Sequence, residues 1–404
     1  MAAKPGLTRR EILAGAASAA AAASLGGIAG CFPNVGGTWP DGAVVSTCGC
    51  TPPDGGASVA EDHSPVPMTG ASTVVTIQRN DSIDATGKSL AQPQLDAVQE
   101  MVDALLSTLA GGAANPWSVL LPNIGSCTRV GLKVNCLSVY FPTSPALVRA
   151  IIKNLQTHTN VCPGNIIVWD RRLDELKDAG QYTEEHLQGA QLLGTITTTK
   201  DWHGPKYSSE YFGTVQGLTP RLSRILTEMT DVTINCPVLK SHNQSGITAA
   251  LKNIFGIIDI PGSFHTAKDG SVHLPTALPA IYNIPQIRNS IKLTIVDALQ
   301  AVVKGDTADP VERTPGRIFA STDPLAVDCY ALDLINQLRA NPLHKQPPDK
   351  PIAGDVISWL EHAYQLGLGT KDYKLVTLGT DGTPAIDGGA TVDGSAEDAG
   401  DPAG

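Results

Sequence analysis

The feature that most constrains the fold is a repeated alternation of short, strongly apolar segments with segments of helical periodicity. Residues 165–170 read as an apolar strand that ends in a carboxylate, whereas residues 95–109 repeat their apolar side chains at helical spacing. Strands that are apolar on both faces are typical of parallel sheets covered by helices. The sequence therefore predicts an α/β fold with a mostly parallel sheet flanked by helices, built as a single large domain or as two closely packed lobes.

The same patterns predict the individual elements. We expect strands at residues 72–77, 129–136, 165–170, 231–236, 291–297, 317–320 and 373–378. We expect helices at residues 95–109, 144–155, 220–229, 247–258, 324–338 and 355–366. In folds of this kind ligands bind beyond the carboxyl ends of the strands, so polar residues that follow a strand are the first candidates for a site.

The N-terminus is typical of an export signal. Arg9 and Arg10 precede an uncharged stretch of Ala, Gly and Ser, as in bacterial signals of the twin-arginine type. The stretch ends Ile-Ala-Gly-Cys, which resembles a lipoprotein cleavage box with Cys31 as the lipidated residue. Simple cleavage and an uncleaved membrane anchor are the alternatives, although Ala and Gly supply little of the transfer energy that a spanning helix needs. We expect a signal peptide at residues 1–30 and a lipid-anchored, extracytoplasmic protein on the periplasmic side or the cell surface. Its expected partners are the twin-arginine translocase and the lipoprotein-processing machinery.

Composition sets the limits of the domain and excludes some partners. The formal net charge of −10 favours neither nucleic acid nor an anionic lipid surface as a partner, so the lipid anchor is the expected contact with the membrane. Residues 31–70 are rich in Gly, Pro and Ser and predict a tether, and the acidic residues 381–404 predict a disordered tail. Residues 71–380 remain for the α/β domain. Because the twin-arginine route moves folded proteins, often with a bound cofactor, a metal or an organic cofactor stays an open alternative.

The cysteines predict a mixture of states. Beyond Cys31 their number is odd, so at least one has no partner within the chain. Three of them lie in apolar runs, where a small buried thiol is expected: Cys136, Cys236 and Cys329.

The richest polar cluster follows residues 231–236. Lys240 and His242 come directly after an apolar segment, and a helix is predicted to begin at about Gly246. Free N–H groups at a helix start favour an anion, Lys240 adds positive charge, and His242 can act as an acid, a base or a metal ligand. Lys252 lies in a segment that is otherwise apolar, so its ammonium needs a partner or a ligand; the alternative is a solvated loop with a surface lysine. The catalytic candidates are therefore His242, Lys240 and Lys252, and the ligand-binding candidates are Lys133, Asn135, Asn243, Ser245, Gly246, Thr248, Asn253 and Asp297.

Metal ligands and a lid are weaker hypotheses. Asp170 ends an apolar strand and is a candidate metal ligand, with helix capping as the alternative. His273 is the second metal candidate, and His265 and His273 together are candidates for a lid over the site, or are simply exposed. Asp323 is expected to cap a helix, and His186 and His203 to lie at the surface.

Five blocks of sequence occur in a set order through the middle of the chain. Residues 130–135 read Val-Gly-Leu-Lys-Val-Asn, residues 237–242 Pro-Val-Leu-Lys-Ser-His, and residues 246–256 begin Gly-Ile-Thr and end Leu-Lys-Asn-Ile-Phe-Gly. Leu-Thr-Ile-Val-Asp-Ala at 293–298 and Ala-Ser-Thr-Asp-Pro-Leu-Ala-Val-Asp at 320–328 follow. As a set these blocks resemble the bacterial and archaeal family called domain of unknown function 362, over residues 128–335. The chain lacks the Gly-Gly-Pro turn that the family often has after the fourth block, and the ferredoxin-like cysteine module of some relatives.

The resemblance implies no reaction, and three functions stay open. A Lys/His segment followed by a Gly-led helix with an internal lysine is similar to the arrangement in nickel-pincer lactate racemases, whose double-Gly run is absent here. The first function is an exported lipoprotein enzyme, metal- or cofactor-dependent, that acts on a small anionic substrate, with His242 as acid or base and the lysines as the anion clamp. The others are a lipoprotein that binds an anionic ligand or metal without turnover, and a structural or assembly lipoprotein. HExxH, Walker, GxSxG and GxGxxG motifs are absent from the sequence.

Overall fold

The computed structural model describes residues 34–38, 44–47, 71–84, 94–200, 203–305, 311–341 and 348–384. The predicted signal peptide, Cys31, most of the tether and residues 385–404 of the tail lie outside these ranges. Within the predicted tether the backbone forms two short antiparallel strands, β1 (Asn34–Thr38) and β2 (Val44–Thr47). Across the described ranges, the helices are too short or too polar to cross a membrane.

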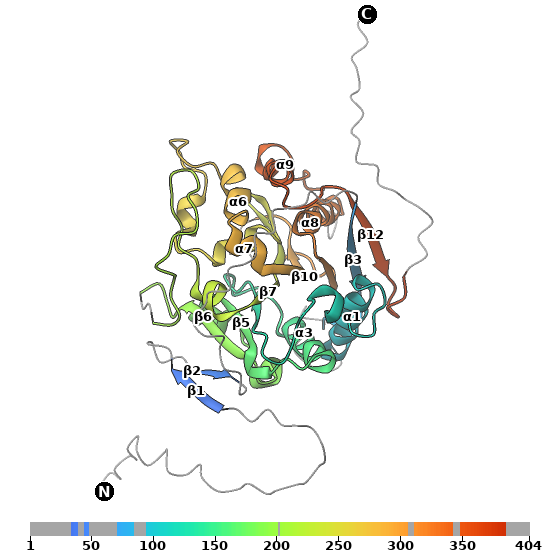
Figure 1. Cartoon of the computed structure of the whole chain (residues 1–404). Coiled ribbons are helices and arrows are strands. Elements are labelled where there is room, and N and C mark those ends of the chain that lie inside the picture. The colour runs from blue at the N-terminus through green and yellow to red at the C-terminus, as the bar shows by residue number, and fades with distance from the viewer. Residues whose placement is uncertain are drawn as a thin grey trace, which may run out of the picture. The chain divides into compact units, whose positions relative to one another are not determined.

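A mixed sheet of ten strands is the framework of the molecule (Figure 1). Its main path runs in the order β12, β3, β11, β10, β7, β4, β5, β6, and a β8–β9 hairpin joins it where β8 pairs with β10. Antiparallel pairing is confined to β11 with its two neighbours and to the hairpin, and the other pairs of this sheet are parallel. The predicted α/β fold with a mostly parallel sheet is confirmed. The strands are β3 (Ser72–Gln78), β4 (Val130–Lys133), β5 (Ile166–Arg172), β6 (Gln191–Ile196), β7 (Val232–Asn235), β8 (Val238–His242), β9 (Gly246–Thr248), β10 (Ile291–Val302), β11 (Arg317–Ser321) and β12 (Tyr373–Leu378).

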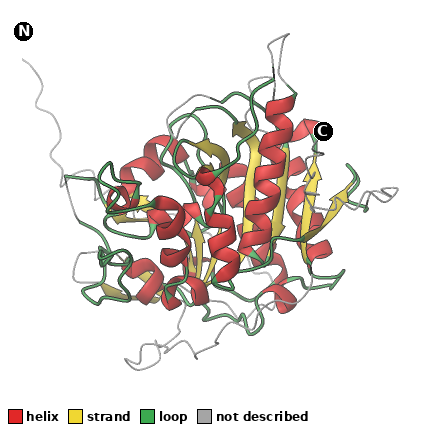
Figure 2. Cartoon of the chain, turned by 90° about the horizontal axis from the view of Figure 1, so that it is seen from above, coloured by secondary structure: helices red, strands yellow, loops and turns green. Residues whose placement is uncertain are grey.

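Helices pack against both faces of this sheet (Figure 2). Successive side chains of a strand point to opposite faces, and on β10 both sets are buried: Val296 belongs to one apolar core and Ile295 to the other. This arrangement explains why the central strands are apolar throughout. One core contains α1 (Gln94–Leu109), α2 (Trp117–Leu120), α3 (Pro145–His158) and α5 (Glu184–Leu187), and the other contains α6 (Leu274–Tyr282), α7 (Pro285–Ser290), α8 (Pro324–Ala340) and α9 (Trp359–Gln365).

Two long helices begin where the sequence predicts. Ser144 caps α3 by accepting a hydrogen bond from the backbone N–H of Ala146, and Asp323 caps α8 by accepting from Leu325 and Ala326. A proline occupies the first helical position in each case, where its missing N–H costs nothing. The prediction that Asp323 caps a helix is therefore confirmed.

Three predicted helices differ from those in the structure. Residues 247–258 form strand β9 and then a 3-10 helix, η5 (Lys252–Gly256), instead of one α-helix. Residues 220–229 are wound only over a π-helical turn, η4 (Ile225–Met229), and residues 355–366 divide into a 3-10 turn, η7 (Asp355–Ile357), and α9. In a short segment, apolar spacing indicates which side chains are buried, and buried side chains occur in strands, turns and helices alike. The spacing alone therefore predicted the wrong type of element for these three segments.

The described cysteines fall into two groups. Cys127 and Cys162 are disulfide-bonded, whereas Cys136, Cys236 and Cys329 are free thiols. Burial raises the pKa of each free thiol well above its ordinary value. Cys136 and Cys236 are buried as expected, Cys329 is half-buried, and the raised pKa disfavours the reactive thiolate at all three.

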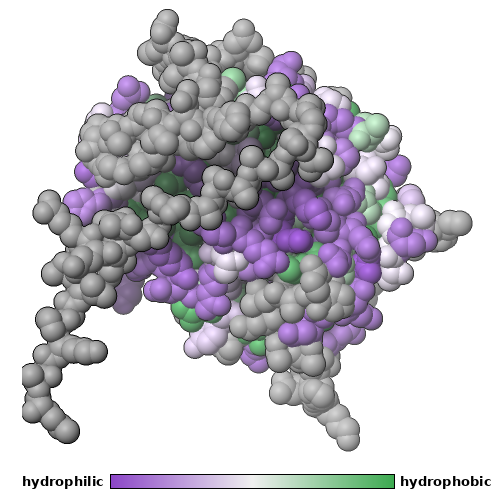
Figure 3. Space-filling model, turned by 90° about the horizontal axis from the view of Figure 1, so that it is seen from below, coloured by the Kyte–Doolittle hydropathy of each residue, from purple (hydrophilic) through white to green (hydrophobic). Residues whose placement is uncertain are grey.

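The surface carries few large apolar side chains. Figure 3 shows a face on which hydrophilic residues predominate and apolar ones are scattered. Leu137, Val139 and Tyr140, which follow β4, are among the exposed exceptions. His203 is exposed as predicted, but the prediction was wrong for His186, which is buried and whose Nδ1 accepts the backbone N–H of Thr183 at the start of α5.

Candidate functional site

A cavity of about 350 Å³ lies at the carboxyl ends of β4 and β5, beside the β8–β9 hairpin. Its walls contain nine of the residues that the sequence singled out: Lys133, Asn135, Asp170, Lys240, His242, Asn243, Thr248, Lys252 and Asn253. The walls also contain residues that were not assigned a role, among them Arg171, Glu175, Gln244 and Phe255, and His265, which was considered only as part of a lid. The structure therefore brings together residues that lie more than a hundred positions apart in the sequence.

The β8–β9 hairpin places three polar side chains on one wall. Lys240 and His242 are two residues apart on β8 and so project from the same face of the strand. Thr248 lies directly opposite Lys240 on β9. Lys240 and His242 were expected in a loop, but they belong to a strand whose side chains are held in register.

The hairpin replaces the helix that was predicted to start at Gly246. Gly246 has a positive φ of 71°, which glycine adopts without strain, and the β-branched Ile247 and Thr248 then pair with Ser241 and Lys240. The N–H groups at the start of the following turn are not available to a ligand, because Ala250 and Leu251 donate theirs to the two carboxylate oxygens of Asp328. The predicted anion site at a helix N-terminus was therefore wrong, and side-chain cations line the cavity in its place.

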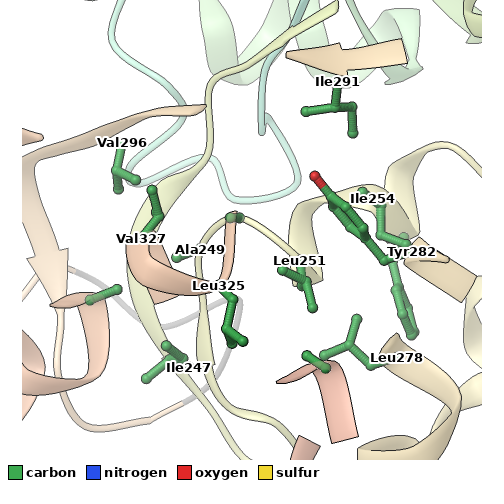
Figure 4. Close-up of a cluster of buried hydrophobic side chains, with 14 of the residues drawn as sticks. Ile247, Ala249, Leu251, Ile254, Leu278, Tyr282, Ile291, Val296, Leu325 and Val327 are labelled. Atoms are coloured by element: carbon green, nitrogen blue, oxygen red, sulfur yellow. The ribbon is translucent and has the colours of Figure 1, made fainter. Parts of the chain in front are cut away.

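The turn that carries Lys252 rests on an apolar cluster (Figure 4). Ile247, Leu251 and Ile254 lie in that cluster with residues of α6 and α8, among them Leu278 and Leu325. Lys252 is also buried, but it lines the cavity, and its Nζ lies 3.5 Å from the centroid of the Phe255 ring. A cation at this distance interacts favourably with the ring, which offsets part of the cost of burial.

Lys133 and Asp170 form a buried ion pair in the cavity wall. The Nζ of Lys133 donates to Oδ1 of Asp170 at 2.7 Å and to the carbonyl of Val134 at 2.7 Å. The other carboxylate oxygen of Asp170 accepts the backbone N–H of Cys136. Asp170 was a candidate metal ligand or helix cap; the structure shows that it anchors Lys133 at the end of β4.

His242 has a defined hydrogen-bonding state. Its Nδ1 accepts the backbone N–H groups of Gln244 and Ser245, each at 3.1 Å. Burial, together with the neighbouring Lys252, His265 and Lys240, lowers the pKa of His242 to about 2. The ring is therefore neutral at physiological pH, and because Nδ1 is an acceptor its proton is on Nε2.

His265 has the opposite tautomer. Its ring stacks on that of His242 with centroids 5.5 Å apart, and it meets Phe255 edge to face. The Nδ1 of His265 lies 3.1 Å from the carbonyl oxygen of Pro261, and since a carbonyl only accepts, Nδ1 carries the proton. In the neutral ring the lone pair is then on Nε2, so the two stacked histidines differ in which ring nitrogen can accept a proton.

The cavity walls carry more positive than negative charge. Lys133, Lys240, Lys252 and Arg171 supply the cations, and Asp170 and Glu175 are the carboxylates. Burial and the neighbouring charge of Asp170 raise the pKa of Glu175 to about 7, against the opposing effect of Arg172. Glu175 is thus partly protonated near neutral pH, which leaves the cavity with a positive excess suited to an anion.

Four predicted residues lie outside this cavity. Asp297 borders a separate cavity of about 80 Å³, where it accepts the N–H groups of Ser144 and Leu299, and burial raises its pKa to about 6. Ser245 and Gly246 shape the hairpin instead of lining the cavity; the hydroxyl of Ser245 donates to the carbonyl of Ile247. His273 is exposed, and its Nε2 lies 3.1 Å from a carboxylate oxygen of Asp355.

These placements bear on the metal hypothesis. His273 and Asp170 do not share a cavity, and in the described part of the chain His, Cys, Asp and Glu side chains form no group of three or more that could hold a metal ion. Metal binding stays a prediction without geometric support from the described residues.

Sequence reasoning missed Glu175 and Arg171, and it considered His265 only as part of a lid. Arg171 and Glu175 follow Asp170 closely, so the polar residues after the end of this strand are the sequence signal that points to them. His265 lies in a polar loop far along the chain, and the sequence carries no signal that its ring stacks on His242.

The fold and the site together define an α/β protein with a cationic, histidine-containing cavity at the carboxyl ends of its parallel strands. The chain belongs to the family called domain of unknown function 362, whose family model matches residues 130–333. This match confirms the family resemblance over almost the range expected from the sequence.

Comparison with individual proteins adds only distant likenesses. No curated protein matches the chain. Among solved structures it is similar to the lactate racemase apoprotein from Thermoanaerobacterium thermosaccharolyticum, with 12% identity, a TM-score of 0.37 and coverage of 68% of this chain and 58% of that one. It is similar also to a structural genomics target from Thermotoga maritima, with 13% identity, a TM-score of 0.37 and coverage of 62% and 60%. The chain thus spans about three fifths of the length of either protein.

Proposed function

We propose that this protein is an exported lipoprotein enzyme that binds a small anionic substrate in the cavity and moves a proton on it, with His265 as the base. The observation that carries the proposal is the stacking of two histidines of opposite tautomer in a cavity with excess positive charge. Each part of the proposal follows from a different set of residues.

The substrate is an anion because the charged groups on the walls favour one. Lys240 on β8 and Lys252 on η5 line the cavity. Arg171 lines it too and follows Asp170, the acidic member of the buried Lys133–Asp170 pair. The positive charges of Lys240, Lys252 and Arg171 therefore act on whatever enters the cavity. Lysines held in place by strands and turns do not need to be ordered when an anion binds, which reduces the entropic cost of binding.

The reaction is a proton transfer because the two rings offer complementary groups. His242 is neutral with a proton on Nε2 and therefore donates a hydrogen bond to a developing negative charge. His265 has its lone pair on Nε2 and therefore accepts a proton. This division narrows the expectation from sequence, in which His242 was the acid or the base.

Export is the part of the proposal that rests on the sequence. The paired arginines and the Cys31 box support it, and the disulfide-bonded state of Cys127 and Cys162 is typical of an oxidising compartment. A lipoprotein that binds the anion without turnover is the alternative function, and it would use the same cavity.

The test measures binding and proton exchange separately. Protein exported through its own signal is incubated in deuterium oxide with a defined mixture of small hydroxy, keto and dicarboxylic acids and sugar phosphates, and loss of carbon-bound proton signals is followed by nuclear magnetic resonance. We expect one component to exchange, and the His265→Ala variant to exchange it more slowly by about 10²-fold or more while still binding it. His203→Ala, which changes an exposed histidine outside the cavity, is the control and should exchange at the wild-type rate.

Other outcomes separate the alternatives. Binding of an anion without exchange in the wild type would support the non-catalytic lipoprotein. Affinity that is unchanged in Lys240→Met and Lys252→Met would show that these lysines do not bind the anion, and the proposal would fail.

A further inference from the structure

Three asparagines form a directional chain of hydrogen bonds that ends at the cavity. The Nδ2 of Asn235 donates to the carbonyl of Ala250 at 3.0 Å, so its Oδ1 is an acceptor. The Nδ2 of Asn253 donates to that Oδ1 at 2.8 Å and to the carbonyl of Lys133 at 3.3 Å. The orientation of the first amide therefore sets that of the second.

The last amide of the chain is fixed in the same way. The Oδ1 of Asn253 can only accept, and Nδ2 of Asn135 donates to it at 2.9 Å. Turning the Asn135 amide over would set oxygen against oxygen, so the orientation follows from the network and not from an arbitrary choice. The Oδ1 of Asn135 is left as a buried acceptor that has no hydrogen-bond partner among the described residues.

An unpaired, buried carbonyl oxygen is costly, so one in a cavity wall is a point where a bound molecule can supply the missing hydrogen bond. Asn135 is 9% exposed and lies in the cavity wall. Thr248, on another wall, has a buried hydroxyl that also has no hydrogen-bond partner among the described residues. The cavity thus presents hydrogen-bonding oxygens in addition to its cations.

From this arrangement we infer that the cavity selects anions that also carry a hydroxyl group, which donates its hydrogen bond to Oδ1 of Asn135. The inference rests on the proposed function for the anion and adds the substrate class, a hydroxylated acid or phosphate ester. An ammonium group could also donate, but Lys240 and Lys252 in the same walls repel a second cation. A second carboxylate in that position could not form a hydrogen bond with Oδ1 of Asn135, because both oxygens only accept.

The experiment compares anions that differ by one group. Affinities are measured by titration calorimetry for glycolate against acetate, for malate against succinate and aspartate, and for glycerol 3-phosphate against propyl phosphate. In the series that fits the cavity, the hydroxylated member should bind about tenfold more tightly than its partners, or better, because the partner leaves the Asn135 oxygen unpaired.

Variants assign the preference to one atom. Asn135→Leu removes the acceptor, and the preference for the hydroxylated member should shrink to less than about threefold. Asn135→Ser is a second variant in case the leucine disturbs folding, because the serine side chain is too short to place its oxygen where Oδ1 of Asn135 lies. Asn160→Ala, which changes an exposed asparagine outside the cavity, is the control and should keep the full preference.

The outcomes are distinct. If the members of each pair bind equally to the wild type, the hydroxyl inference is overturned while the anion site stands. If Asn135→Leu keeps the preference, another residue selects the hydroxyl and the assignment to Asn135 is wrong. If aspartate binds as tightly as malate, the donor is not restricted to a hydroxyl. If none of the anions binds, the proposed function itself fails.

Discussion

Lys133 and Asp170 form a pair of opposite charges that is almost fully buried in the cavity wall. Removing either charge leaves the other buried without compensation, which is more costly than removing both. We expect Lys133→Met to lose roughly 3–5 kcal/mol of unfolding free energy, and Lys133→Met with Asp170→Asn to lose clearly less than the sum of the single changes. Urea unfolding of the four proteins gives the coupling; additive losses would show that the pair is not energetically linked.

Glu175 makes anion binding depend on pH. Because burial and Asp170 raise its pKa to about 7, the side chain gains its negative charge as the pH rises through neutrality. That charge opposes an anion in the same cavity, so affinity for malate should fall roughly three- to tenfold between about pH 6 and about pH 8. In Glu175→Gln the fall should be smaller, since only other groups then titrate. Equal pH profiles for the two proteins would exclude Glu175 as the cause.

At the scale of elements, Asp328 connects helix α8 to the turn that carries Lys252. Its carboxylate accepts the N–H groups of Ala250 and Leu251, and burial raises its pKa to about 7. A carboxyl whose pKa is raised by folding stabilises the folded state below the ordinary pKa, and this contribution is lost as the pH rises through the raised value. The unfolding free energy of the wild type, relative to Asp328→Asn, should therefore decrease between about pH 4 and about pH 8, by a few kcal/mol in order of magnitude.

Urea unfolding of both proteins at several pH values measures that difference. The exposed Asp372→Asn variant is the control and should run parallel to the wild type. A gap between wild type and Asp328→Asn that stays constant across the range would show that Asp328 does not titrate in the folded protein.

The sequence predicted best the elements in which the apolar pattern and the length of the segment indicate the same type of secondary structure. Strand β5 and helix α1 have patterns that fit one structure only, and the caps Ser144 and Asp323 mark helix starts by local chemistry. The hairpin was predicted as a helix because Ile247 and Leu251 are buried, and burial of these side chains is expected in a strand as well as in a helix. Whether this segment forms a strand or a helix depends on the hydrogen bonds to Asp328 and on the positive φ of Gly246, and the local sequence pattern predicts neither.

The candidate site was predictable in part for the same reason. Lys133, Lys240 and His242 lie at or next to the ends of apolar segments, and parallel pairing gathers such ends at one edge of the sheet. The tautomers of His242 and His265 and the unpaired oxygen of Asn135 depend on hydrogen bonds between distant segments. Those features decide the proposed chemistry, and only the folded structure contains them.

At the scale of the whole molecule, location in the cell is the property to test. Arg9→Lys with Arg10→Lys should keep the protein in the cytoplasm of a bacterial host that has the twin-arginine system, because that system reads the paired arginines. Lys4→Ala, which changes another cation of the same segment, should leave export intact. Cell fractionation and immunoblotting follow the protein, and export of the double variant would disprove the assignment.

Lipidation is a separate prediction for the same molecule. Cys31→Ser should release the exported protein from the membrane fraction, because the acyl chains are its expected anchor. Intact mass spectrometry of the wild type should show a mass increase of acyl chains on a chain that starts at Cys31. A wild type of unmodified mass would favour simple cleavage.

The burial of Cys136 and Cys236 has a consequence for the order in which the protein matures. Both sulfurs are buried in an apolar core of the folded domain, whereas Cys127 and Cys162 are oxidised. A chain that met an oxidant while still unfolded would expose all of these thiols together, and wrong pairs would compete with right ones. If folding is complete before the chain crosses the membrane, as in the route we propose, the core thiols are already shielded when oxidation begins. Maturation would then need no isomerase to undo mistakes, because the fold itself selects which cysteines can react.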